Sequence, residues 1–219
     1  KGASFINLDM GLPVMGGRTC VEGQMPEEAP YGIDYYYNEY MEYEGALNIS
    51  GYDPGFELLS DNTLIHGLLQ GIDYIKHHKD EINDWLKVEP LEIPDDLCVI
   101  NFRGGEYKHV PSFFLPKSYW DAGIEHMKQI NPAMRFEVHT DDADEARKFF
   151  PDYPIFQDIS LNWRSIRYAK YLLLSNSTFA ILPSWLNGCY TVAPMYFAGH
   201  NVGKWSLKQN YMPDWHYIV

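Results

Sequence analysis

The chain has 219 residues, of which 46% are hydrophobic and 21% are charged, and this composition is typical of a folded globular protein. Its formal net charge of -13 opposes binding to nucleic acid or to an anionic membrane, because both partners are negatively charged and the sequence contains no large basic patch. No stretch is long and apolar enough to predict a membrane-spanning segment. The cysteines, Cys20, Cys98 and Cys189, lack metal-site spacing, so we expect reduced thiols and a cytoplasmic protein.

The first part of the chain shows little periodicity. Residues 3–9 have the pattern of a short strand that ends in a glycine-rich loop. Residues 31–43 are dense in Tyr and Glu. We interpret them as a loop-rich layer packed on a core, and an aromatic surface for a partner or for an acceptor substrate is the alternative.

A strand is predicted at residues 63–70 and an amphipathic helix at residues 72–86, where apolar residues recur at helical spacing. His77 and His78 are adjacent in this helix and therefore point to different faces, which does not suit a zinc site. Residues 88–96 contain two prolines and four acids, and we place a domain boundary there because this composition interrupts both helix and sheet.

From residue 97 onward, strand and helix patterns alternate, which indicates an α/β fold with a doubly wound parallel sheet. We expect Ser118 to cap the first helix of this half, and we expect any helix after residue 178 to be short or kinked at Pro183. Strands are predicted at residues 97–102, 134–139, 154–156 and 172–174, and helices at residues 116–130, 143–150 and 162–170.

The strand at residues 97–102 leads directly into Arg103 and two glycines. An arginine at the carboxyl end of a parallel strand suits phosphate binding, because its planar guanidinium donates two hydrogen bonds at once, and glycines permit close approach of a ligand or of the backbone. The alternative is an Arg103 that pairs with Glu106 or with a nearby Asp.

Two other strands also end in polar residues. Residues 175–178 (Ser-Asn-Ser-Thr) predict a helix start that can bind an anion, although an ordinary Ser/Thr cap has the same pattern. Residues 140–142 (Thr-Asp-Asp) can contact a ribose or a base, or can cap the helix that follows. Because the strands are parallel, the polar residues that follow them should lie together at one edge of the sheet, which favours a phosphate or nucleotide site there. Because the sequence has neither the dinucleotide glycine fingerprint nor the Walker lysine motif, an oxidoreductase or a P-loop NTPase is disfavoured.

These segments resemble the alpha-1,2-fucosyltransferase family, whose members carry H-x-R-x-G-D-Y after a strand, a strand that ends in S/T-D-D, and a late S-N-S-T-F followed by W-L-N. The similarity runs from about Leu64 to the C-terminus, whereas the opening G-G-L-G-N-Q loop is missing. Asn101, Glu106, Asn162 and Pro183 stand where the family usually has His, Asp, Asp and Gly. The matching segments are residues 101–107 (NFRGGEY), 140–142 (TDD), 175–179 (SNSTF) and 185–187 (WLN).

The resemblance implies a GT-B-like enzyme with a partial acceptor-side domain at residues 1–90 and a nucleotide-sugar domain at residues 97–219. It implies inverting transfer of a sugar, fucose from GDP-fucose above others, to a hydroxyl of a glycan acceptor, with no metal and no cofactor. Arg103 and Glu106 are the expected catalytic residues, and His66 and Gln70 are weaker acceptor-side candidates. The expected donor-binding residues are Arg103, Gly105, Asp141, Asp142, Ser175, Asn176, Ser177, Thr178 and Phe179.

Two other functions fit the same sequence. One is a noncatalytic module that keeps the fold and binds a nucleotide sugar or a carbohydrate. The other is a structural subunit whose Tyr-rich first part binds a protein partner.

Overall fold

The computed structural model describes residues 35–38, 41–44, 47–50, 52–59, 63–66, 69, 71–199 and 211–219. The strand predicted at residues 3–9, Cys20 and Gln70 lie outside these residues. The chain divides into two compact units, residues 1–87 and residues 88–219, and each is treated separately below. Within the described chain no helix has both the length and the apolar character needed to span a membrane.

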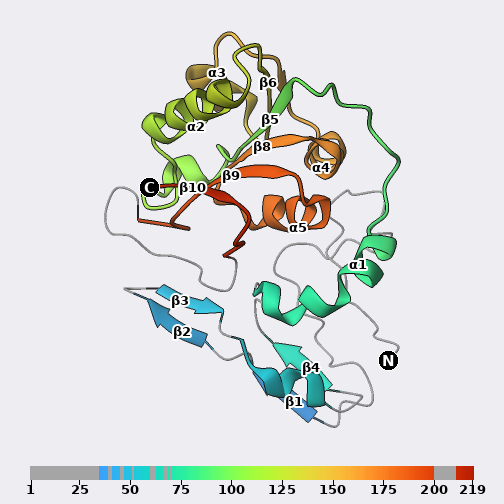
Figure 1. Ribbon diagram of the computed structural model, residues 1–219. Helices are drawn as coiled ribbons and strands as arrows, with labels where there is room; N and C mark the ends of the chain where they lie inside the picture. Colours follow the sequence, from blue (N-terminus) through green and yellow to red (C-terminus); the bar gives the residue numbers. More distant parts are fainter. Residues whose placement is uncertain are drawn as a thin grey trace. The chain divides into compact units, whose positions relative to one another are not determined.

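The first unit contains two small sheets (Figure 1). Strands β1 (Tyr35–Asn38) and β4 (Thr63–His66) pair in parallel, and β2 (Met41–Glu44) pairs with β3 (Leu47–Ser50) in antiparallel fashion. The strand predicted at residues 63–70 is therefore confirmed in its first half. The loop-rich interpretation of residues 31–43 is wrong for its described part, because the tyrosines of this region favour strands.

The helix predicted at residues 72–86 is interrupted. Two 3-10 turns, η2 (Ile72–Tyr74) and η3 (Lys76–His78), precede the short helix α1 (Lys79–Trp85). Tyr74 is buried and makes edge contacts with Tyr52 and Phe56, at ring-centroid distances of 5.2 and 5.0 Å. Lys76 at the start of η3 also forms an ion pair with Asp73 of η2, at 2.6 Å. Tertiary contacts of the first turn thus override the helical periodicity.

The second unit is built on a six-stranded sheet whose neighbouring strands are all parallel (Figure 1). The spatial order is β10-β9-β8-β5-β6-β7, so the chain winds outward from β5 in one direction and then returns to wind outward in the other. The predicted doubly wound α/β fold is confirmed. The strands are β5 (Leu97–Phe102), β6 (Arg135–Thr140), β7 (Ile155–Phe156), β8 (Tyr171–Leu174), β9 (Tyr190–Pro194) and β10 (His216–Ile218).

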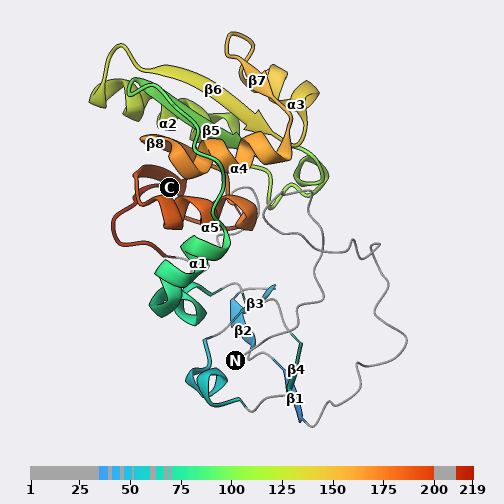
Figure 2. The same ribbon diagram turned by 90° about the vertical axis from the view of Figure 1, so that its right-hand side faces the viewer.

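Helices cover both faces of this sheet (Figures 1 and 2). Helices α2 (Lys117–Ile130) and α3 (Ala143–Phe149) lie on one face, and α4 (Ile159–Tyr168) and α5 (Thr178–Asn187) lie on the other. Alternate residues of β5 serve the two layers, because Ile100 and Phe102 pack with Trp120 of α2 whereas Val99 packs with Ile166 of α4. Burial on both faces explains why β5 is a continuous apolar run in the sequence.

Two helix starts differ from the prediction. Helix α2 begins after Pro116, which occupies the N-cap position, so Ser118 lies inside the helix and does not cap it. Pro116 has the extended backbone of an N-cap residue, and its carbonyl oxygen accepts the N–H of Tyr119 at 3.1 Å. Helix α4 begins at Ile159, earlier than predicted, because the side chain of Asp158 accepts a backbone N–H at 2.6 Å and caps it.

The boundary segment of residues 88–96, all of which are described, contains neither helix nor strand, as predicted. Helix α4 holds its first residues in place. Arg164 donates to the carbonyl oxygens of Glu89 and Pro90 at 3.0 and 3.1 Å, and the hydroxyl of Tyr168 donates to that of Val88 at 2.8 Å.

The two described cysteines are free thiols. Cys98 is fully buried in β5, and burial raises the pKa of Cys189 to about 11, so the Cys189 thiol stays protonated at neutral pH.

Gly123 provides a test of the packing between α2 and β8. A Cβ at this buried position would approach the side-chain tips of Leu173 to 2.5 and 2.8 Å. Alanine is favoured over glycine in a helix by about 1 kcal/mol, but overpacking a core costs about 1–3 kcal/mol. We expect Gly123→Ala to lower the free energy of unfolding in urea, and Gly123→Ala combined with Leu173→Val to regain part of the loss. A more stable single variant would contradict this close packing.

Candidate functional site

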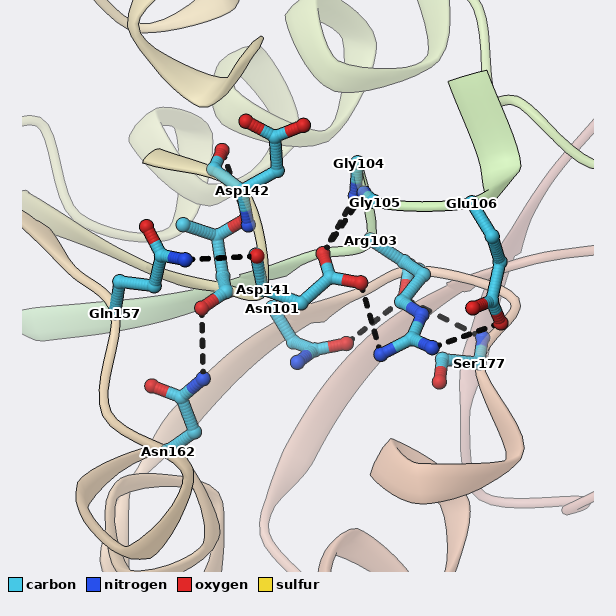
Figure 3. Close-up of polar contacts among 12 residues, drawn as sticks. Asn101, Arg103, Gly104, Gly105, Glu106, Asp141, Asp142, Gln157, Asn162 and Ser177 are labelled. Carbon is cyan, nitrogen blue, oxygen red and sulfur yellow. Dashed lines mark hydrogen bonds and ion pairs between the residues drawn. The ribbon is translucent and has the colours of Figure 1, made fainter. Parts of the chain in front are cut away.

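The candidate site lies where the winding of the sheet reverses, between the carboxyl ends of β5 and β8. The two ends are hydrogen-bonded to each other, because the backbone N–H of Ser175 donates to the carbonyl oxygen of Asn101 at 2.9 Å. Open parallel sheets bind ligands outside such a switch point. Figure 3 shows that the polar ends of β5, β6 and β8 meet on this edge, as the sequence predicts.

Arg103 immediately follows β5 and is held by two carboxylates (Figure 3). Its Nη1 lies 2.9 Å from Oδ2 of Asp141, and its Nη2 lies 2.9 Å from Oε1 of Glu106. The alternative considered for Arg103, a pair with Glu106 or with a nearby Asp, is thus present in the structure. Both partners are acidic, so Arg103 is electrically compensated before any ligand binds.

Asp141 also binds the backbone of the Arg-Gly-Gly loop. Its Oδ1 accepts hydrogen bonds from the N–H groups of Gly104 at 2.8 Å and of Gly105 at 3.2 Å. A Cβ at position 105 would lie 2.5 Å from Oδ2 of Asp141. Gly105 is therefore required for the approach of the Asp141 carboxylate, which is a different reason for this glycine from the ligand approach that we expected.

The guanidinium of Arg103 remains charged in this half-buried position. Burial lowers the pKa of Arg103, but the hydrogen bond to Glu106 and the negative charges of Asp141 and Glu106 outweigh it, so the pKa lies above its usual value. The guanidinium also lies over the ring of Tyr107 at 5.6 Å from its centroid, a distance typical of a cation–π contact. Its Nε is buried and has no hydrogen-bond partner among the described residues.

Asp142 caps the helix that follows it, which is one of the two roles considered for it. Its side chain accepts the N–H of Glu145 at 3.0 Å, and its Oδ2 pairs with Nζ of Lys108 at 2.5 Å. The hydrogen bond from Lys108, followed by that from the Glu145 backbone, lowers the pKa of the Asp142 carboxyl. Asp141 does not cap α3, because its carboxylate is directed to the loop after β5.

The Ser-Asn-Ser segment after β8 is buried and partly occupied by internal contacts. The hydroxyl of Ser175 donates to Oδ1 of Asn101 at 2.8 Å and accepts the N–H of Ser177 at 3.3 Å. The amide of Asn176 donates to the carbonyl oxygen of Phe113 at 2.9 Å and to that of Phe197. Ser175 and Asn176 thus hold the neighbouring loops together.

The start of α5 is the remaining part of this segment. Ser177 occupies the N-cap position with only 4% exposure, and its side chain forms no capping hydrogen bond within the described chain. Thr178 opens the helix, and Phe179 packs against Trp163 with ring centroids 5.7 Å apart. The helix runs through Pro183 and ends at Asn187, and the next residue, Gly188, is the C-cap with a left-handed φ of 72°.

Two side chains that the sequence did not single out as site residues hold the turn at residues 140–142. The amide of Asn162 donates to the carbonyl oxygen of Thr140 at 3.1 Å, and the amide of Gln157 donates to that of Asp141 at 3.0 Å (Figure 3). Asn162 also contacts Nδ1 of the buried His139 at 3.0 Å. The sequence offered one signal for these contacts. His139 directly precedes the polar residues 140–142, and a buried histidine there needs a polar partner such as Asn162.

The expected acceptor-side residues belong to the first unit. His66 is the last residue of β4, and its side chain lies outside the described structure, as does the whole of Gln70. Among the described residues, no group of three or more His, Cys, Asp and Glu side chains is arranged to hold a metal ion.

No family model matches the sequence, and no curated protein is similar enough to count as a match. Among solved structures, the E. coli heptosyltransferase WaaC with ADP is similar over 60% of this chain and 40% of its own, with 11% identity and a TM-score of 0.41. The Thermosulfurimonas dismutans KpsC, a beta Kdo 2,7 transferase, is similar over 66% of this chain and 52% of its own, with 10% identity and a TM-score of 0.37. The chain therefore spans about half or less of the length of these proteins. At such identities the similarity concerns the course of the chain and not the chemistry of the site.

The cap and the ion pair of Asp142 can be separated by substitution. Asp142→Ala loses both interactions, and the loss of the cap alone should lower the free energy of unfolding by about 1 kcal/mol. Asp142→Asn keeps a capping oxygen and loses only the charge, so its free energy of unfolding should fall less. Because the folded-state pKa of Asp142 is depressed, the contribution of its charge is present above the usual carboxyl pKa and is lost as the pH falls through the folded value. Chemical denaturation from pH 7 to pH 3 should therefore show the wild type and Asp142→Asn converging in acid.

Asp144→Asn is the matched control, since it removes another acid from the first turn of α3. A wild-type advantage over Asp142→Asn that does not shrink in acid, or that Asp144→Asn reproduces, would contradict the assigned ion pair.

Proposed function

We propose that the second unit binds the diphosphate of a nucleotide sugar at the switch point and that the protein is a glycosyltransferase. The observation that carries this proposal is the placement of Arg103 and the uncapped start of α5 at the ends of the two adjacent strands β5 and β8. A guanidinium and a helix N-terminus both favour an anion, and neither requires a metal ion.

The proposed reaction is an inverting transfer. A hydroxyl oxygen of the acceptor attacks the anomeric carbon of the sugar, and the bond between that carbon and the diphosphate oxygen breaks on the opposite face. Negative charge develops on the leaving diphosphate, so donors fixed in advance stabilise the transition state more than the ground state. We assign this stabilisation to Arg103, with Ser177 and Thr178 at the start of α5.

The acceptor hydroxyl must lose its proton during the transfer. Glu106 is our first candidate for the base, because it is 70% exposed and adjoins Arg103. His66 is a weaker candidate from the first unit.

The sugar donor that we propose is GDP-fucose, transferred to a glycan. Its support is the sequence resemblance of the segments at residues 101–107, 140–142, 175–179 and 185–187. Of the residues expected to bind the donor, Ser175, Asn176 and Phe179 contact other parts of the protein, so we assign them to the framework of the site.

A noncatalytic nucleotide-sugar binder is the second candidate, and the environment of Asn101 favours it. Asn101 stands where the resembling family has a titratable His. It is buried, with 5% exposure, and its Oδ1 accepts a hydrogen bond from the hydroxyl of Ser175. This position therefore supplies no acid or base. Calorimetric titration with GDP, followed by an assay for hydrolysis or transfer of GDP-fucose, separates the candidates: a transferase does both, a binder only binds, and a structural subunit does neither.

Arg103→Ala should weaken GDP binding by about ten- to a hundredfold, because a hydrogen bond to a charged group contributes roughly 1.5–3 kcal/mol. Arg103→Lys should restore only part of the affinity, since an ammonium keeps the charge but loses the two-pronged geometry. Arg103→Ala also frees Asp141 and Glu106, so its melting temperature should fall, and the affinity per folded molecule is the deciding quantity.

Arg135→Ala is the matched control. Arg135 forms a comparable ion pair with Asp96 before β5, at the opposite edge of the sheet, with nitrogen–oxygen distances of 2.8 and 2.6 Å. Its loss should lower stability without changing GDP affinity. Unchanged affinity in Arg103→Ala beside a lowered melting temperature would reject Arg103 as the phosphate ligand.

GDP binding should not depend on a divalent metal ion, because Arg103 and the helix start supply the positive potential that a metal would otherwise provide. We expect the same calorimetric affinity in EDTA and in magnesium-containing buffer. Loss of GDP binding on addition of EDTA would contradict this prediction.

A further inference from the structure

The nitrogens of the Arg103 guanidinium are engaged unequally. Nη1 faces Asp141, Nη2 faces Glu106, and Nε has no partner among the described residues. Nε and Nη2 form one edge of the guanidinium, the edge through which Arg135 binds both oxygens of Asp96 in this same protein. Glu106 therefore uses only one of the two donors on this edge, Nη2, and leaves Nε without a partner.

Asp141 is not the carboxylate that a ligand would replace. It receives hydrogen bonds from Arg103, Gly104 and Gly105, and its side chain is 25% exposed. Its removal would leave the two backbone N–H groups and Nη1 without their acceptor at the same time, and each such loss is unfavourable.

Glu106 is held much more weakly. Its one contact with Arg103 joins residues three apart, and its side chain is 70% exposed. Exposed ion pairs of this kind contribute little to stability, because solvent screens the charges and the side chain loses conformational freedom. A stronger anion can take its place on Nη2. Nε is unpaired but buried, so the departure of the Glu106 side chain must also uncover it before the incoming anion can contact both nitrogens.

We propose that Glu106 is an exchangeable counterion of Arg103, displaced when a phosphate group binds the Nε–Nη2 edge with two oxygens. Asp141 stays in place as a positioning residue that fixes the guanidinium from its other side. This inference rests on the proposed function, since the phosphate is that of the sugar donor. The exchange also releases the Glu106 carboxylate beside the donor, where our first candidate for the base is needed.

The exchange makes the affinity for phosphate depend on Glu106 in a direction opposite to that of an ordinary ligand residue. Glu106→Gln should bind inorganic pyrophosphate and GDP about two- to tenfold more tightly than the wild type, because no ion pair has to be broken and one repelling charge is gone. Titration calorimetry measures both ligands.

Asp95→Asn is the matched control. Asp95 is 79% exposed, forms a single ion pair with Lys170 at 2.6 Å, and precedes β5 at the opposite edge of the sheet. The Asp95→Asn variant removes the same charge as Glu106→Gln, but away from the candidate site. Its affinities for pyrophosphate and GDP should therefore equal those of the wild type.

Asp141→Asn should weaken pyrophosphate binding by about tenfold, because the guanidinium loses its anchor. The NMR signal of the Arg103 Nε–H group distinguishes positioning from a loss of stability. Pyrophosphate should shift this signal in the wild type and in Glu106→Gln, and a folded Asp141→Asn should show a changed signal before any ligand is added.

The outcomes separate this inference from the proposed function. If GDP binds to the wild type and Glu106→Gln binds equally or more weakly, the exchange is rejected while the donor site stands. If Asp95→Asn gains as much as Glu106→Gln, the gain reflects net charge and the exchange is also rejected. If neither GDP nor pyrophosphate binds to the wild type or to Glu106→Gln, both the proposed function and the exchange are rejected.

Discussion

The candidate site depends on the carboxylate of Asp141, which joins the ends of two neighbouring strands. One oxygen binds the backbone of Gly104 and Gly105 after β5, and the other binds Arg103, although Asp141 itself follows β6. Without this anion, Nη1 of the half-buried guanidinium and two backbone donors would lack an acceptor, which is unfavourable in a partly dehydrated environment. The loop after β5 therefore takes its shape from a residue that follows the neighbouring strand β6.

A second set of buried polar contacts holds the carboxyl ends of the strands in place. Asn101 and Ser175 link β5 to the start of α5, and Asn162 links α4 to the carbonyl oxygen of Thr140. Buried polar side chains are tolerated when their hydrogen bonds are formed, and such bonds restrict the geometry more than apolar packing does. The strand ends at the switch point are thus held by directional contacts from α4 and from the sheet itself.

The sequence predicted the architecture of the second unit well, because strands buried on both faces are continuous apolar runs and helices alternate with them. It located Arg103 for the same reason, since a polar residue after such a run lies at the sheet edge. It did not predict the binding of Asp141 to the backbone of Gly104 and Gly105, which lie 37 and 36 positions away in the chain, because periodicity reports only local structure. The early start of α4 was signalled by Asp158, a capping residue that lies before the apolar pattern begins.

An internal counterion also bears on selectivity in this acidic protein. An unpaired Arg103 would attract any anion. An Arg103 that is already paired with Glu106 favours only ligands whose interaction with the guanidinium is stronger than that of the displaced Glu106. An anion with one suitable oxygen merely replaces Glu106 on Nη2, so its gain is small. A phosphate with two oxygens engages Nε as well and removes an unsatisfied buried donor. On our proposal, the pairing seen in the structure raises the discrimination between phosphate groups and simpler anions while it lowers the affinity for both.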